Sequence, residues 1–247
     1  MTKFLSSVAL AAGLMAAGSA NAYLVFSGVD NNGNAGAQVA ATNSSAAETS
    51  FKNNLVGVGT ENFETRATGT GAPLPLNFGA AGTATLNGAG VVAANSPGAT
   101  NGAGRYSVPG GTQYWEVNAG GGNPFQVDFS NSLAAFGFYG IDLGDFGGTL
   151  TLQLSKGGSV VGSQVVTTAA QNVADGSILY FGLIASNASE EFDSIRFLST
   201  VGTGDVFAFD SFTIGTKEQV RQLPEPASLA LVAGSLLGLG LVRRRRA

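Results

Sequence analysis

Any chemistry of this chain would have to use carboxylates, Lys, Tyr or Ser, because the 247-residue sequence contains no histidine and no cysteine. Their absence excludes serine-histidine triads, histidine bases, disulfides and metal sites built on thiolate or imidazole. One acidic pair, Asp142 and Asp145, falls in Asp-Leu-Gly-Asp at the expected end of a strand. Such a pair could bind Ca²⁺ together with loop carbonyl oxygens. Alternatively, each aspartate could accept hydrogen bonds from backbone N–H groups within a turn.

Paired carboxylates also raise the question of glycoside hydrolysis. That reaction needs two carboxyl groups about 5 to 9.5 Å apart in a cleft, one of them with a raised pKa. A sequence does not reveal such a separation, and acidic residues are common at strand ends. A carboxylate-based glycosidase is therefore the least favoured of the functions considered.

Tyr114 and Trp115 are candidates for sugar binding through their rings. Adjacent residues in a strand point to opposite faces, so we expect one ring in the core and the other exposed. An exposed ring could stack on the apolar face of a sugar. The alternative is that Trp115 fills the core of the domain.

The charge of the chain excludes one class of partner. Removing Lys3 and the four arginines near the C-terminus from the 12 basic residues leaves seven between residues 23 and 223. Removing Glu225 from the 16 acidic residues leaves 15, so this region has a net charge of −8. Such a surface repels nucleic acid phosphates, whereas it is compatible with cations and neutral sugars.

The elements expected to position these residues are mainly strands. Short aromatic or β-branched segments recur between Gly, Asn, Pro and Ser, a pattern that predicts an all-β, antiparallel sandwich of jelly-roll kind. The clearest alternation, over 149–154, predicts Leu150, Leu152 and Leu154 on the core face. In the last segment the alternation changes at Asp210, which predicts a bulge there or burial on both faces. The expected strands are 23–26, 74–78, 83–86, 113–117, 125–129, 135–141, 149–154, 160–166, 178–184, 192–198 and 206–214.

One short helix is expected near the start of the domain, over 46–55. Ser44 or Ser45 could cap it, and Glu48 would lie in its first turn. Before it, residues 1–22 have the pattern of a signal peptide: Lys3, an apolar run and the cleavage site Ala20-Asn21-Ala22. Cleavage there would make Tyr23 the first mature residue.

The C-terminal segment 224–247 reads as a membrane-directed address. Pro224-Glu225-Pro226 precede an uncharged run, 227–242, that would span about 24 Å as a helix. The cationic block that follows predicts a cytoplasmic C-terminus by the positive-inside rule, with the domain outside. Residues 216–223 read as a polar linker. The cationic block consists of Arg243, Arg244, Arg245 and Arg246.

These three parts in this order resemble the PEP-CTERM sorting signal of Gram-negative bacteria, also catalogued as an ice-binding protein C-terminal motif. The resemblance implies that an exosortase-type membrane protease acts at the tripeptide and removes the helix. The protein would first be anchored in the inner membrane and then reach the cell surface or the extracellular exopolysaccharide matrix of a biofilm. The motif covers only a tenth of the chain and leaves the function of the domain open.

The middle of the chain is similar to a recurrent ectodomain of PEP-CTERM proteins, through 62–64, 135–148 and 207–215. Its pattern is similar to that of jelly-roll carbohydrate-binding modules. That resemblance implies a structural Ca²⁺ held between the first and last strands, here by Glu64 and Asp210.

We therefore expect one exported, non-enzymatic sandwich domain over 23–215. The first hypothesis for its function is a structural or adhesive protein of the cell surface or exopolysaccharide matrix. The alternative is a carbohydrate-binding module.

Overall fold

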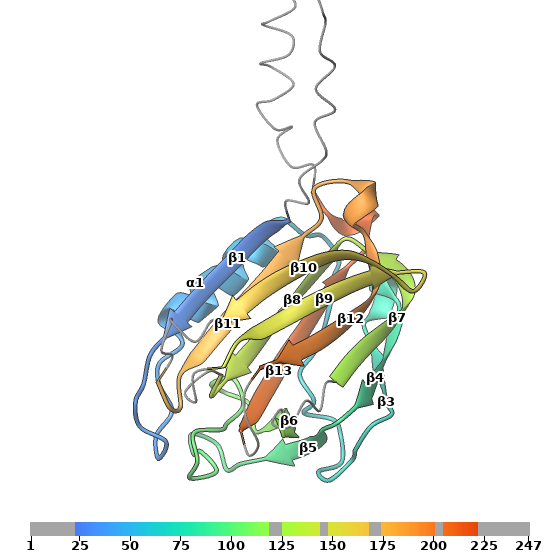
Figure 1. Ribbon diagram of the computed structural model, residues 1–247. Coiled ribbons are helices and arrows are strands. Elements are labelled where there is room, and N and C mark those ends of the chain that lie inside the picture. Colours follow the sequence, from blue (N-terminus) through green and yellow to red (C-terminus); the bar gives the residue numbers. More distant parts are fainter. Residues whose placement is uncertain (1–22, 119–124, 144–147, 168–173, 201–204, 222–247) are drawn as a thin grey trace, which may run out of the picture.

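A computed structural model of the protein describes residues 23–118, 125–143, 148–167, 174–200 and 205–221, without the side chain of Thr167. Two antiparallel sheets pack face to face and form a β-sandwich (Figure 1). The first sheet has the order β1 (Leu24–Asp30), β11 (Ile178–Ile184), β8 (Ala135–Ile141), β13 (Val206–Gly215), β6 (Gln113–Asn118) and β5 (Val91–Ala94), with β2 (Gly59–Glu61) also paired to β13. The second has the order β10 (Ser159–Thr167), β9 (Leu150–Lys156), β12 (Phe192–Ser199), β7 (Phe125–Leu133), β4 (Thr83–Gly88) and β3 (Leu74–Asn77).

The space between the sheets is filled largely by phenylalanine rings. Phe138 lies at the centre, with ring centroids 5.4 Å from Phe197 and 5.7 Å from Phe209. Leu150, Leu152 and Leu154 are buried in the same core, which confirms the predicted alternation. Close contact of many apolar rings and branched side chains supplies the main stabilisation of such a core.

A second apolar cluster lies on the outer face of the first sheet. Helix α1 (Thr42–Lys52) packs there over β1 and β11, with Ala47 and Phe51 buried. Gly28 of β1 permits this close approach, because a Cβ at that position would lie 2.3 Å from the carbonyl oxygen of Asn43. The outer face of the first sheet is therefore covered by α1 at β1 and β11.

The helix begins earlier than the sequence predicts, at Thr42 rather than after a serine cap. Its cap comes from β1: the Asp30 carboxylate accepts hydrogen bonds from the backbone N–H groups of Asn43 (2.8 Å) and Ser44 (2.9 Å). A capping side chain from another element has no local sequence signal. Leu55, the last residue of the expected helix, is buried but lies beyond the end of α1.

Two local features interrupt the regular strands: a glycine turn and the predicted bulge near Asp210. Gly157 and Gly158, both with positive φ, form the turn between β9 and β10. The pairing of β13 with β8 shifts register between Asp210 and Thr213, and Ser211 has a φ of 52°. This is a bulge next to Asp210, as predicted. The prediction omitted the short strands β2 and β5, and it did not predict the 3-10 helices Gly79–Ala81, Ala188–Glu190 and Lys217–Gln219.

The described part of the predicted linker is attached to the domain. Its 3-10 helix has a capping box formed by Thr216 and Gln219. Arg221 N donates to the carbonyl oxygen of Asn54 at 2.8 Å, and Val220 pairs with Leu55. The structure thus holds the chain against the domain as far as residue 221.

Both predicted membrane-directed segments, 1–22 and 224–247, lie outside the described residues, including Ala20, Ala22 and the sorting motif. Within the residues that are described, no helix combines the length and the apolar character needed to cross a membrane.

Candidate functional site

Glu64 and Asp210 lie close together, but both bind one loop of the protein. Glu64 Oε1 accepts hydrogen bonds from the backbone N–H groups of Thr112 (2.6 Å) and Gln113 (2.8 Å), and Oε2 accepts one from the Thr112 hydroxyl (2.7 Å). Asp210 Oδ2 accepts one from the Val108 N–H at 2.8 Å. The two carboxylates therefore hold opposite ends of the loop 108–113.

The two environments move the pKa values apart. Burial is the main cause that raises the pKa of Asp210 to about 8; the negative charge of Glu64 adds to the rise, and hydrogen bonds from Val108 and Ser211 oppose it. Burial also acts to raise the pKa of Glu64, but its hydrogen bonds outweigh this effect and hold the pKa below its usual value.

These two residues do not fit the calcium site that the resemblance implies. Ca²⁺ takes about six to eight oxygen ligands. Here the carboxylate oxygens already accept hydrogen bonds from the loop, and no group of three or more acidic side chains suited to a metal ion occurs among the described residues. The geometry is that of a loop clamp.

Asp142 is a structural turn residue, and its predicted partner Asp145 lies outside the described residues. Asp142 is buried with a φ of 63°, and its Oδ1 accepts a hydrogen bond from the Gly176 N–H at 2.9 Å. Its Oδ2 lies 3.7 Å from Arg105 Nη1. Asp142 thus binds a backbone N–H group, but one from a distant loop and not from its own turn as the alternative for the aspartate pair supposed.

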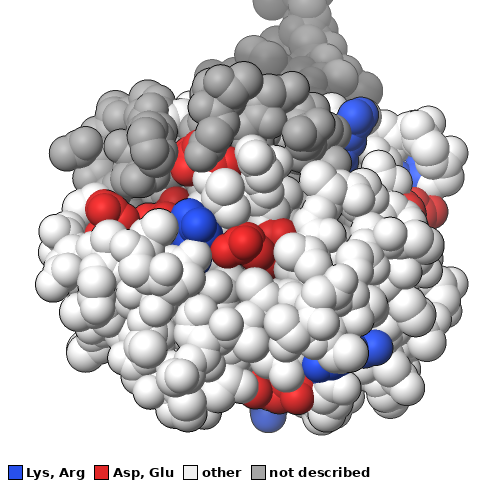
Figure 2. All heavy atoms as spheres, turned by 90° about the horizontal axis from the view of Figure 1, so that it is seen from below, with Lys and Arg blue, Asp and Glu red and all other residues white. Residues whose placement is uncertain are grey.

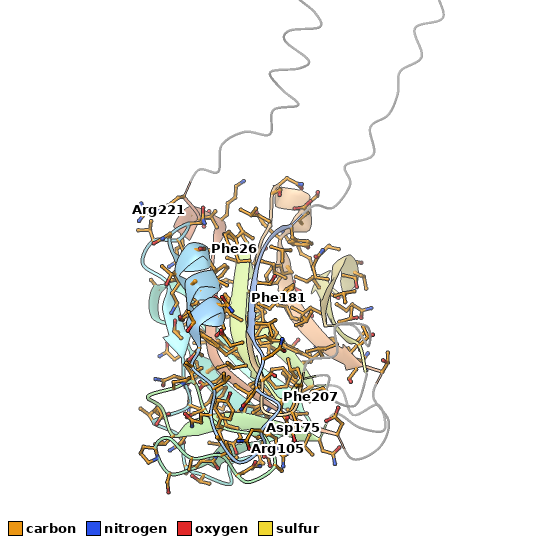
Figure 3. All side chains as sticks on the ribbon, turned by 90° about the vertical axis from the view of Figure 1, so that its left-hand side faces the viewer. Phe26, Arg105, Asp175, Phe181, Phe207 and Arg221 are labelled. Carbon is orange, nitrogen blue, oxygen red and sulfur yellow. The ribbon has the colours of Figure 1, made fainter. Side chains whose placement is uncertain are left out.

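Arg105 links several acidic groups at this end of the sandwich. Its Nε donates to Glu116 Oε2 at 2.9 Å. Asp175 lies beside Asp142, because a Cβ on Gly104 would be 2.4 and 2.5 Å from their Oδ1 atoms. Figure 3 shows Arg105 and Asp175 close together, and Figure 2 shows basic and acidic side chains in contact on an otherwise mostly uncharged end. The sequence did not indicate this cluster, because its members come from separate loops.

The expectation that Tyr114 or Trp115 exposes a ring is wrong. Their exposed fractions are 1% and 0%. Trp115 lies between the sheets, where it stacks with Phe63 at 6.3 Å between centroids. Tyr114 lies in the cluster on the outer face of the first sheet, with Tyr106. Both faces of β6 are covered, so neither ring can stack on a sugar.

A surface that sequence reasoning missed is the outer face of the second sheet. Along the strands of this sheet, buried side chains such as Val127 and Ile195 point into the core, and the polar side chains between them point to the outer face. Helix α1 lies on the other sheet, so this face remains accessible across the described strands (Figure 1). Strand register places one polar side chain from each of five strands in a single row: Asn87, Gln126, Arg196, Gln153 and Ser163.

The members of this polar row differ in what they bind. Asn87 Nδ2 and Gln126 Nε2 donate to the two oxygens of Asp128, at 2.7 and 2.6 Å. This fixes both amides and neutralises part of the field of the aspartate. Arg196 is exposed, and its guanidinium group forms no ion pair or hydrogen bond with any residue that the structure describes. The row thus presents amide oxygens beside a guanidinium fork with unused donors.

No protein-family model matches the chain, and no curated protein matches it. Solved structures show weak similarity. The K2 cleaved adhesin domain of Lys-gingipain gives a TM-score of 0.39 at 13% identity, covering 64% of this chain and 98% of that one. A CBM27-1 from Caldicellulosiruptor saccharolyticus, solved with mannohexaose, gives 0.36 at 10% identity, covering 65% and 97%. The C-terminal family 22 carbohydrate-binding module of a Clostridium thermocellum protein gives 0.36 at 13% identity, covering 65% and 94%.

Proposed function

We propose that the protein is exported, sorted to the cell surface through its Pro224-Glu225-Pro226 tail, and binds polysaccharide there without catalysis. An exosortase-type protease would be its processing partner, and exopolysaccharide its ligand. The proposal for export and sorting rests on the resemblance of the two terminal segments. Successive strands β7 to β13 alternate largely between the two sheets, which supports a jelly-roll-like description of the domain.

The observation that carries the binding proposal is the polar row on the second sheet. Its side chains repeat at the spacing of neighbouring strands, about 4.8 Å. Neutral and acidic sugars present hydroxyl or carboxylate groups repeatedly along an extended chain. Amide oxygens accept hydrogen bonds from hydroxyls, while the planar guanidinium of Arg196 can donate two parallel bonds to vicinal oxygens.

The charge at this row favours an oxygen-rich ligand. Arg196 forms no ion pair with a described residue, and Asp128 on the same face is already bound by Asn87 and Gln126. A ligand oxygen therefore finds hydrogen-bond donors at Arg196, while ligand hydroxyls can donate to the neighbouring amide oxygens. A polysaccharide that carries carboxylate groups would gain a charge-assisted hydrogen bond at Arg196.

The absence of catalysis in this proposal is supported by how the carboxylates are used. Glu64 and Asp210 accept hydrogen bonds from backbone N–H groups of the loop 108–113. General acid and base groups must instead reach the glycosidic oxygen and a water molecule or the anomeric carbon. A structural or adhesive matrix protein that does not bind sugar directly is the other function considered.

Binding of labelled polysaccharides to cells that display the full chain tests the proposal. The probes are a neutral xylan, a neutral mannan and a polyuronate, and the variants are Arg196→Ala and Gln126→Ala. We expect Arg196→Ala to weaken binding about tenfold, which corresponds to about 1.4 kcal/mol. The matched control is Arg221→Ala. It removes the same charge from an exposed residue of the linker 216–223, away from the polar row.

Two results would contradict this proposal. Binding that survives both substitutions would place the glycan site elsewhere on the domain. If cells that display the wild-type chain bind none of the three polysaccharides, the result would favour a structural matrix protein that does not bind sugar.

A further inference from the structure

The two lateral sides of the sandwich differ in how their edge strands are protected. On one side the edges are β3 and β5, each of four residues, and β3 contains Pro75. Short strands and proline are common protections against pairing with another chain. On the other side the edges are β1 and β10, with seven and nine residues. Of the five exposed large apolar residues described, four lie on these two strands: Leu24, Val25, Val160 and Val165.

Of the two long edges, β1 is the more regular, although Asn43 Nδ2 donates a hydrogen bond to the carbonyl oxygen of Val29 at 3.1 Å. Strand β10 carries two register irregularities against β9, and such bulges disturb further pairing. Strand β1 pairs with β11 in unbroken register over all seven residues. It contains no proline, and its single charged residue, Asp30, is buried and caps α1. The outer edge of β1 is thus a regular, uncharged template for another strand.

The first sheet also extends beyond the second on this side. Phe26 and Gly28 face α1, because Phe26 packs against Phe51 and Gly28 contacts Asn43. The alternate residues Val25 and Ser27 must therefore face the side of the second sheet. Both are nevertheless exposed, with Val25 at 40%. Among the described residues, this face of β1 is therefore exposed at Val25 and Ser27, whereas Val29 packs against the core.

We propose that β1 pairs antiparallel with β1 of a second copy of this chain, about a two-fold axis at Ser27. An isologous contact of this kind requires a self-complementary surface. In this register Ser27 meets its own counterpart, and Val25 lies opposite Val29 of the other copy on the same face. Cross-strand pairs of β-branched residues stabilise a sheet. The result is one continuous sheet across two domains.

Helix α1 is compatible with this arrangement. The helix lies over both β1 and β11 and is therefore set back from the outer edge of β1. Two copies of α1 would then lie antiparallel on the same face of the joined sheet. The flank of α1 toward the edge carries Asn43, Ala46 and Ser50, which are exposed, small and uncharged.

The lack of exposed charge at the edge of β1 favours a second copy of the chain over a charged partner. The ion pair of the helix, between Glu48 and Lys52, lies on its other flank, where Glu48 accepts a hydrogen bond from the Tyr139 hydroxyl. Although the region 23–223 has a net charge of −8, the strand edge and the adjacent helix flank expose no charged side chain. Two copies therefore meet without like-charge contacts, while an acidic or basic partner finds no ion pair there.

Disulfide crosslinking tests the contact, and the full chain suits it because it contains no cysteine. Ser27→Cys, Ser163→Cys and Ser130→Cys would each be exported in a bacterial host, oxidised on intact cells and separated without reductant. All three serines are exposed, but the last two lie on β10 and β7. We expect a covalent dimer from Ser27→Cys alone, because opposed Cβ atoms in a strand pair are near disulfide distance.

A second substitution in the Ser27→Cys chain separates specific pairing from collision. Val25→Lys places a charge on the proposed contact and should lower the dimer yield several-fold. Val165→Lys is the matched control on the other edge strand, and it should leave the yield unchanged. The proposal is overturned if Ser27→Cys gives no dimer, if all three cysteines give equal yields, or if Val25→Lys has no effect. Glycan binding by Arg196 is measured separately, so either proposal can fail alone.

Discussion

Asp210 and Glu64 hold opposite ends of the loop 108–113, one through the Val108 N–H and the other through the N–H groups of Thr112 and Gln113. The clamp joins the last strand of the domain to the segment after β2. It also brings two carboxyl groups together whose pKa values are shifted in opposite directions. Both carboxylates thus act in stability, and each can be tested separately.

The first prediction concerns pH. Asp210 has a pKa raised from 3.8 to about 8 by burial, so between these values the folded protein keeps a proton that the unfolded chain has lost. Stability must therefore fall as pH rises from about 4 to 8, by up to about 1.4 kcal/mol per pH unit, and level off above. Thermal unfolding from pH 5 to 9 measures this. Asp210→Asn should flatten the dependence, and an equally steep curve for that variant would assign the titration to another group.

The second prediction concerns Glu64. Replacing it with alanine removes three hydrogen bonds to the loop, so Glu64→Ala should lower the free energy of unfolding by about 2 kcal/mol. Denaturant unfolding at pH 7 would check this. Glu218→Ala removes a fully exposed carboxylate and serves as the control, with little change expected. Equal stability of the two variants would show that the clamp does not stabilise the fold.

The third prediction separates the core role of Trp115 from sugar binding. Trp115→Ala should destabilise the domain by about 3 to 5 kcal/mol, because it leaves a large cavity between the sheets. Trp115→Phe should cost less and leave glycan binding intact. The measurements are thermal unfolding and binding of the same labelled polysaccharides. If a fully folded Trp115→Phe domain does not bind the polysaccharides, the result would show that the Trp115 ring takes part in sugar binding.

The fourth prediction concerns the sorting proposal. Replacing Pro224, Glu225 and Pro226 with alanine should leave the C-terminal segment uncleaved and the protein in the membrane fraction. Intact mass and location in an exosortase-containing host would show it, beside the wild-type chain that has lost both ends. If both proteins retain Arg243 to Arg246, the tail serves only as an anchor.

Much of the fold could be predicted from local patterns. The bounds of β8 and β11 match the expected strands, because long apolar runs between turn residues leave few alternatives. The bulge near Asp210 was predicted from the point where the alternation changes. The start of α1 was not predicted, because the capping group, Asp30, comes from β1.

The candidate site was harder to predict for a related reason. Sequence marks Gln126 and Arg196 as polar positions on separate strands, but only register shows that they are neighbours. The assumption that one of Tyr114 and Trp115 must be exposed failed because β6 is covered on both faces. Carboxylates chosen for metal binding proved to bind backbone N–H groups, and the sequence does not reveal where those groups lie.

The pairing of β1 with β11 has a consequence for the timing of folding. Leu24 pairs with Ile184, so the first strand finds its partner only when 160 further residues of the chain are present. Tyr23 is held in the same way, by a hydrogen bond from its hydroxyl to the carbonyl oxygen of Glu190. Such non-local contacts make folding slow. The first strand of the domain is therefore among the last segments to reach its final pairing, and under the proposed export this pairing would form after translocation.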